Sequence, residues 1–192
     1  MVILGPGPPF DDQDFEESDL GTPQAGFFSL IQRFLTQRIK LLVAALEAIV
    51  SELSEADRQE RIELLIEFAR SLPPLPERLE RLKDAEHRVE ECQSPVFLFV
   101  ETEADRVEIH ADVPIEAPTV RGFVAILVEG LNGATVEDVL GVKNDLIDRI
   151  GLAEILGMQR VRGLGGVLSR LKKEVVKASN PRPPGNSQVP GE

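Results

Sequence analysis

The stretch from residue 95 to residue 112 decides the fold, and its sequence is PVFLFVETEADRVEIHAD. Its first part, 95–101, is rich in β-branched and aromatic residues, which favours a strand. A polar turn follows at 103–105. Apolar and polar residues then alternate, in the order Val107, Glu108, Ile109, His110, Ala111 and Asp112. Because successive side chains of a strand point to opposite faces, the alternation predicts an antiparallel hairpin with one buried face.

Apolar residues at three- and four-residue steps predict helices before the hairpin. The first spans about 38–52. A second helix follows Ser54, whose spacing to Asp57 resembles a capping box, and it ends before Pro73. A short third helix is expected at 77–85.

Helices are also predicted after the hairpin. Residues 120–129 are almost wholly apolar, which indicates a helix deep in the core. Thr135 can cap a short helix, and residues 146–150 form another helical turn. A glycine-rich segment at 157–166 leads into the last helix, at about 164–177.

The ends of the chain differ from its middle. Residues 1–26 hold a Gly-Pro run and six acidic residues without any basic one, which predicts a disordered acidic tail. A domain is expected at 27–177, and a Pro- and Gly-rich disordered tail at 178–192. The apolar cluster at 27–34 fits either a helical extension packed on the core, which we favour, or a segment that docks on a partner or a membrane surface.

Composition narrows the class of protein. The 192 residues carry a net charge of −12, with a pI near 4.7, and this charge argues against binding to a phosphate backbone. No apolar run reaches the ~18 residues of a membrane span, and the first residues do not resemble a secretory signal. The single cysteine, Cys92, excludes an intramolecular disulfide and a multi-cysteine zinc site. A lone thiol fits a reducing cytosol, so we expect a cytoplasmic protein.

Cys92 follows a possible short strand at 88–90 and precedes the strand at 95–101, so it is expected in a loop at the edge of the sheet. Its polar neighbours argue against a thiol that is buried as a small apolar side chain. The thiolate is the reactive form of cysteine. Glu90 and Glu91 should raise the pKa of the thiol by repulsion of like charges, and Arg88 or more distant cations must oppose them if the thiol is to react.

Other signals of catalysis are weak. His87 and His110 could each pair with Cys92 as a base, although surface histidine is the simpler interpretation of both. The sequence holds no phosphate-binding loop, no G-x-S-x-G motif and no metal-spaced cluster of His and Cys. The glycines at 163–166 follow no predicted strand and precede no suitably placed lysine, so they indicate helix packing.

Several segments together resemble the SufE-type sulfur-acceptor proteins (SufE and CsdE), over roughly 38–177. The segments share the order and spacing seen in that family: a proline-rich connection, a cysteine loop with its strand, a buried helix after the hairpin, and an arginine-containing segment before the last helix. They are Leu72–Pro76, Arg88–Phe97, Val120–Gly122 after Ala111-Asp112, and Gln159–Leu164.

The resemblance implies an α+β fold of the SufE/IscU type, a two-layer α/β sandwich in which helices cover a small antiparallel sheet. It also implies a sulfur carrier. Such proteins accept persulfide sulfur from a pyridoxal-phosphate cysteine desulfurase of the SufS or CsdA type. They pass it to an iron–sulfur scaffold of the SufB type. The carrier holds no metal and no cofactor, because pyridoxal phosphate belongs to the desulfurase. An accessory protein is therefore expected, rather than a stand-alone enzyme.

By position in the family, Cys92 is the sulfur acceptor, and Asp112, Arg121 and Arg160 match charged positions around its loop. A guanidinium group favours a thiolate or persulfide anion by charge-assisted hydrogen bonds. Alternatively, Asp112 only ends a strand and the two arginines only pair with surface carboxylates. Glu91 stands where the family commonly has glycine, which stiffens the loop and adds negative charge.

Two other functions remain open from the residues. The domain could be an adaptor that binds and stimulates a desulfurase without carrying sulfur. It could also be a one-cysteine thiol hydrolase or peroxidase that uses Cys92 with His87 or His110.

Overall fold

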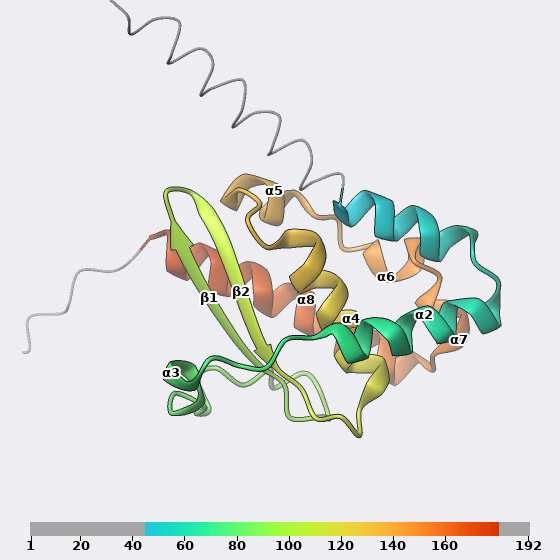
Figure 1. Ribbon diagram of the computed structural model, residues 1–192, viewed down its shortest axis with the longest axis horizontal. Coiled ribbons are helices and arrows are strands. Elements are labelled where there is room, and N and C mark those ends of the chain that lie inside the picture. Colours follow the sequence, from blue (N-terminus) through green and yellow to red (C-terminus); the bar gives the residue numbers. More distant parts are fainter. Residues whose placement is uncertain (1–44, 181–192) are drawn as a thin grey trace, which may run out of the picture. The chain divides into compact units, whose positions relative to one another are not determined.

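The computed structural model of the chain describes residues 45–180 (Figure 1). The predicted acidic tail at 1–26, the apolar cluster at 27–34 and residues 181–192 of the predicted tail at 178–192 lie outside the described residues. The start of that predicted tail, 178–179, is instead helical. No helix in the described part of the chain is long and apolar enough to cross a membrane.

Two strands form the predicted hairpin, β1 (Phe97–Glu103) and β2 (Arg106–Asp112). They pair antiparallel, with Leu98 opposite Ala111. Both residues of the connecting turn, Ala104 and Asp105, have positive φ angles of 46° and 67°, as the type I′ hairpin turn requires. The hairpin is confirmed, whereas the short strand expected at 88–90 is reduced to a single bridge between Arg88 and Phe97.

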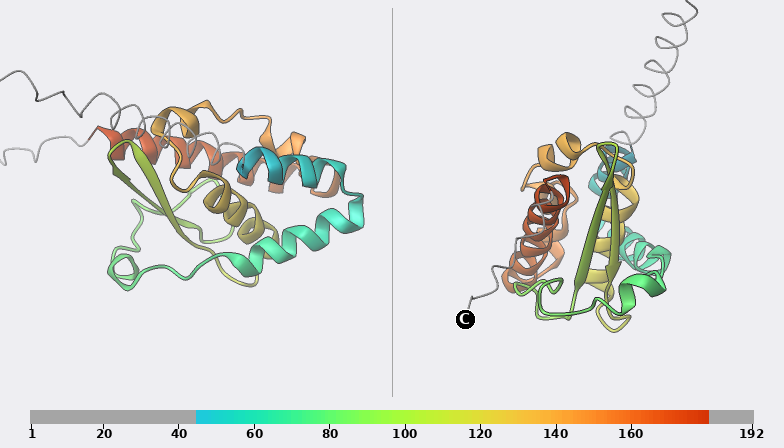
Figure 2. Two further views of the ribbon diagram at one scale, coloured as in Figure 1. Left: turned by 45° about the horizontal axis from the view of Figure 1, so that its top comes forward. Right: turned by 90° about the vertical axis from the view of Figure 1, so that its left-hand side faces the viewer.

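The inner face of the hairpin packs against two helices, α4 (Pro118–Leu131) and α8 (Met158–Ser179). In Figure 2 the strands run between α8 on one side and α4 on the other. Inward residues of β2 share one apolar core with both helices. The predicted α+β fold, a small antiparallel sheet with helices around it, is confirmed. Buried residues of this face are Leu98, Val107, Ile109 and Ala111.

The outer face of the hairpin is covered by the proline-rich connection and α3 (Glu77–Glu80). Leu75 and Leu79 pack there against Phe99 in a second, smaller apolar cluster. The helix expected at 77–85 is thus a single turn. Asp84 accepts a hydrogen bond from the backbone of His87 at 3.1 Å, and such local bonds compete with helix formation.

Helix α2 (Arg58–Ser71) ends before Pro73 as predicted, but its start differs from the prediction. Asp57 caps the helix in a capping box with Glu60. The hydroxyl of Ser54 instead donates to Ser51 O, inside the preceding helix at 45–55. The capping box therefore lies three residues later than expected.

The C-terminal half holds the predicted short helices α5 (Val136–Gly141), capped by Thr135, and α6 (Leu146–Arg149). One further turn, α7 (Leu152–Ile155), was not predicted. Helix α8 starts at Met158, six residues earlier than expected, and includes the glycine-rich segment. It continues two residues beyond the predicted end at 177.

Arg61 ties three elements together through a guanidinium group that is almost wholly buried. Its nitrogens donate to the carbonyls of Leu53 and Ala56, each at 2.9 Å, and of Gly151 at 3.2 Å. One nitrogen also pairs with Glu154 at 3.0 Å. Arg61 thus joins the end of the helix at 45–55 to α2 and to the start of α7.

We expect Arg61→Met to lower the free energy of unfolding by about 3 kcal/mol, because it leaves buried carbonyls without donors. Urea denaturation measures this change. Arg58→Met, at an exposed position of the same helix, is the control and should change stability by less than ~0.5 kcal/mol. Equal unfolding midpoints for the two variants would contradict the role assigned to Arg61.

Candidate functional site in the Cys92 loop

Residues 89–96 form a closed loop at the edge of β1, called the Cys92 loop below. Its ends are held together by a hydrogen bond from Val89 N to Val96 O at 2.9 Å, and both side chains are fully buried. Within the loop, Cys92 N donates to Val89 O at 3.3 Å. The predicted location, a loop at the edge of the sheet, is confirmed.

The side chain of Cys92 is only 6% exposed and belongs to the main apolar core. The interpretation that polar neighbours keep this thiol out of the core was therefore wrong. Glu91 and Gln93 on either side are exposed, so the tight turn directs the cysteine inward and its neighbours outward. Composition around a loop residue does not fix which way its side chain points.

Burial raises the pKa of the Cys92 thiol above its ordinary value, and a backbone hydrogen bond with Ser94 opposes part of that rise. The cause is desolvation of the thiolate, rather than the repulsion by Glu90 and Glu91 expected from the sequence. In the closed loop the thiol is therefore protonated and poorly nucleophilic at neutral pH.

The Cys92 loop rests on the glycine-rich part of α8. A Cβ atom placed on Gly163 would lie 3.9 Å from Cys92 Sγ and 3.7 Å from Glu91 O. The predicted role of these glycines in packing is confirmed at Gly163 and Gly166, and the thiol lies against the second turn of the helix.

Two arginines flank the strip of α8 that the loop covers. Arg160 precedes Gly163 by three residues, and Arg162 precedes Gly166 by four, so each neighbours a contact position on the helix surface. Both are exposed, and the first turn of α8 holds no acidic residue. Within residues 45–180, no hydrogen bond or ion pair engages either guanidinium group. Sequence reasoning found Arg160 and missed Arg162, although helical spacing was a usable signal.

Arg121 and Asp112 have contacts that do not involve the thiol. Arg121 donates to the carbonyls of Ala69 at 2.7 Å, Leu72 at 3.2 Å and Val113 at 2.5 Å. It thereby fastens the end of α2 to the segment after β2. Asp112 pairs with Lys83 at 2.7 Å. The alternative prediction, that Arg121 pairs with surface carboxylates, is therefore wrong, because the hydrogen bonds of its guanidinium group go to backbone oxygens.

Neither histidine contacts Cys92 among the described residues. His87 Nδ1 lies 2.7 Å from Asp84, and the ring stacks on Phe99 with a centroid distance of 4.5 Å. His110 Nε2 lies 3.4 Å from Glu101 and 3.3 Å from Glu108. The described part of the chain therefore gives the thiol no histidine base.

Glu101, Glu108 and His110 are close enough together to approach one metal ion. Arg78, however, donates to both oxygens of Glu101 at 2.5 Å, and this hydrogen bond is the main cause of the lowered pKa of that carboxyl group. A guanidinium group at that distance repels a second cation, so the group is better described as an ion-pair cluster.

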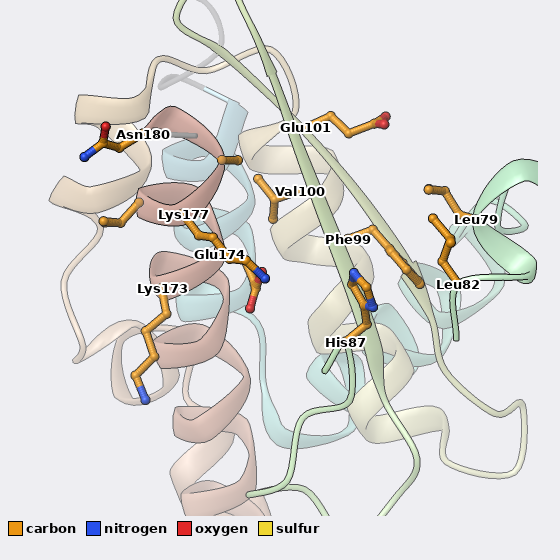
Figure 3. Close-up of a pocket in the computed structure, with 12 residues that line it drawn as sticks. Leu79, Leu82, His87, Phe99, Val100, Glu101, Lys173, Glu174, Lys177 and Asn180 are labelled. Carbon is orange, nitrogen blue, oxygen red and sulfur yellow. The ribbon is translucent and has the colours of Figure 1, made fainter. Parts of the chain in front are cut away.

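A groove of about 1040 Å³ lies between β1 and the C-terminal end of α8. Figure 3 shows Lys173 and Lys177 on its helical wall and His87 and Phe99 on the opposite side. At a rise of 1.5 Å per residue, Lys173 lies about 15 Å along the axis from Gly163. The groove is thus separate from the thiol.

The fold and the loop define a class of small α+β domain that shelters one cysteine at the edge of a two-stranded sheet. The family model described as "SufE: Fe-S metabolism associated domain" matches residues 47–175. The chain belongs to the SufE family, as the resemblance implied.

Individual relatives agree with this assignment. An uncharacterized SufE-like protein of Mycobacterium tuberculosis is 41% identical over 138 residues, which are 71% of this chain and 95% of that protein. A protein of Plasmodium vivax named cysteine desulfuration protein SufE is 27% identical over 72% of this chain and 52% of its own length. The solution structure of a hypothetical protein from Thermus thermophilus superposes with a TM-score of 0.62 at 35% identity, over 70% of this chain and 96% of that chain.

We expect the native thiol to titrate at higher pH than the unfolded one, because burial disfavours its thiolate. The rate of alkylation by iodoacetamide, followed by intact mass against pH, measures this in buffer and in urea. The stabilisation linked to this thiol should be complete below the unfolded pKa and decline as pH rises through the folded one. A native midpoint at or below the unfolded midpoint would contradict a buried thiol.

Proposed function

We propose that the chain accepts persulfide sulfur on Cys92 from a cysteine desulfurase and delivers it to an iron–sulfur scaffold. The observation that carries the proposal is the placement of the chain's one cysteine in the Cys92 loop, where it is sheltered against the strip of α8 that Arg160 and Arg162 flank. Membership of the SufE family and the name of the Plasmodium relative support the same chemistry.

The transfer is a thiol–persulfide exchange. Cys92 loses its proton and its thiolate attacks the outer sulfur of the desulfurase persulfide. One S–S bond breaks as another forms, so Cys92 becomes Cys–S–SH and the desulfurase cysteine leaves as a thiolate that takes up the proton. No net oxidation occurs. Pyridoxal phosphate is the partner's cofactor, and this chain needs no metal for the exchange.

Docking on the desulfurase has to open the Cys92 loop, because the sulfur of the closed loop is buried and protonated. Opening both exposes the sulfur and removes the desolvation that raises its pKa. The closed loop in turn limits oxidation of the thiol in a reducing cytoplasm. The start of α8 is a suitable docking face, since Met158 is 71% exposed and the exposed Arg162 follows it one turn later on the same side of the helix.

The direct test is sulfur acceptance. We expect incubation with a SufS-type desulfurase, cysteine and pyridoxal phosphate to add the mass of one sulfur atom to Cys92, and Cys92→Ser to gain nothing. Reduction should remove the added mass. A Cys92→Ser protein that accepted sulfur would refute the proposal. Stimulation of the desulfurase by both proteins, with transfer to neither, would identify an adaptor instead.

Arg160 is expected to act on the anion of the transferred sulfur. We predict that Arg160→Gln slows persulfide formation about tenfold, because a charge-assisted hydrogen bond to the sulfur is lost. The urea midpoint should be unchanged, since the side chain is exposed. Lys173→Gln removes an equal charge from the same helix, far from the loop, and should transfer sulfur at the wild-type rate. Equal rates for both variants would leave Arg160 without a direct role.

A further inference from the structure

At Gly166 the Cys92 loop lies tightly against α8, with Glu91 next to the glycine. A Cβ atom on Gly166 would stand 2.4 Å from Glu91 Cβ and 3.2 Å from Glu91 Cγ. The first distance is shorter than real Cβ contacts allow. A Cβ atom on Gly163, by contrast, would lie at ordinary contact distances of 3.7 Å or more from the loop. Position 166 is therefore the one of these two contact positions where any side chain would collide with the loop.

Rotation of a side chain cannot relieve this collision. A Cβ atom is fixed by its own backbone and cannot rotate away, unlike the far end of a glutamate. Relief has to come from a shift of the loop backbone at Glu91, away from α8. Glu91 directly precedes Cys92, whose sulfur packs beside Gly163 on the same helix, so a shift of one residue moves the other.

We infer that Glu91 and Gly166 form a steric latch that sets the closed position of the Cys92 loop and thereby controls access to the thiol. Both are positioning residues, since they act through Cys92. The latch adds control of access to the thiol to the proposed function, and its biological use rests on that function. The latch itself concerns only the position of the loop.

The surroundings of the pair fit a latch. The base of the loop is held by the hydrogen bond between Val89 and Val96 and by the burial of both side chains. Glu91 nevertheless remains exposed, although its Cβ lies against the helix. A basic group on a docking partner can therefore reach Glu91, and lifting this residue from Gly166 would carry the neighbouring thiol outward.

Two glycine substitutions in α8 test the latch. We expect Gly166→Ala to speed native alkylation of Cys92 by iodoacetamide roughly tenfold, because overpacking opens the loop. Gly165→Ala is the matched control: its Cβ would meet only Ile147 Cδ1, at 4.0 Å, and it should alkylate like the wild type. Both variants gain the same helix propensity, so the difference between them reports the contact. Equal alkylation rates in the two variants would overturn the latch.

Substitutions at Glu91 identify the responsible atom. In a Glu91→Gly background the Cβ is gone, so adding Gly166→Ala should no longer speed alkylation. In a Glu91→Ala background the Cβ remains, so the roughly tenfold effect should persist. An undiminished effect with Glu91→Gly would overturn the latch.

Folding of each variant is checked by circular dichroism and urea denaturation. If Gly166→Ala alone does not fold, Glu91→Gly should restore folding to the double variant, and failure to do so would also count against the latch. Alkylation needs no desulfurase. A protein that accepts no sulfur can thus still show the latch, and a sulfur carrier can lack it.

Discussion

Burial of α4 sets the positions of the elements that hold the Cys92 loop. Nine residues of this helix are buried, and each large apolar side chain among them contributes on the order of 1.5–3 kcal/mol. Helix α2 can approach because residue 122 is glycine: a Cβ there would lie 2.2 Å from Leu65 O. With α2, β2 and α8 all packed on α4, the edge of β1 and the glycine-rich face of α8 are fixed, and the loop is held between them.

In the closed loop, burial protects the Cys92 thiol but also makes it less reactive. Burial protects the thiol from oxidants and from unwanted electrophiles, and it also raises the pKa of the thiol, whose reactive form is the thiolate. A carrier whose sulfur was always ionised and exposed would react before it met its partner. In the proposed function, opening upon docking would solve both problems with one movement, since exposure and ionisation would follow together. Arg160 and Arg162 would then stand beside the strip of α8 that the loop had left.

The sequence predicts those features whose cause is local. The hairpin follows from the alternation along 107–112, which matches the period of a strand, and the deep burial of α4 follows from its apolar run. The start of α8 was missed because glycines lower helix propensity, whereas packing of the Cys92 loop on them outweighs that loss. The contacts of Arg121 were not predictable, since its acceptors Ala69 and Leu72 lie about fifty residues away in the chain. The inward turn of Cys92 depends on loop geometry, which composition does not encode.

The structure explains why residue 166 of α8 is glycine, but it does not explain the glycine at position 165. Glycine inside a helix costs about 1 kcal/mol relative to alanine, so a retained glycine needs a compensating contact. At Gly166 the compensation is the approach of Glu91, and this approach requires only that one of the two facing residues lack a Cβ. In this chain the Cβ is absent on the helical side, at Gly166, so the loop side can carry glutamate, and a charged residue stands next to the thiol.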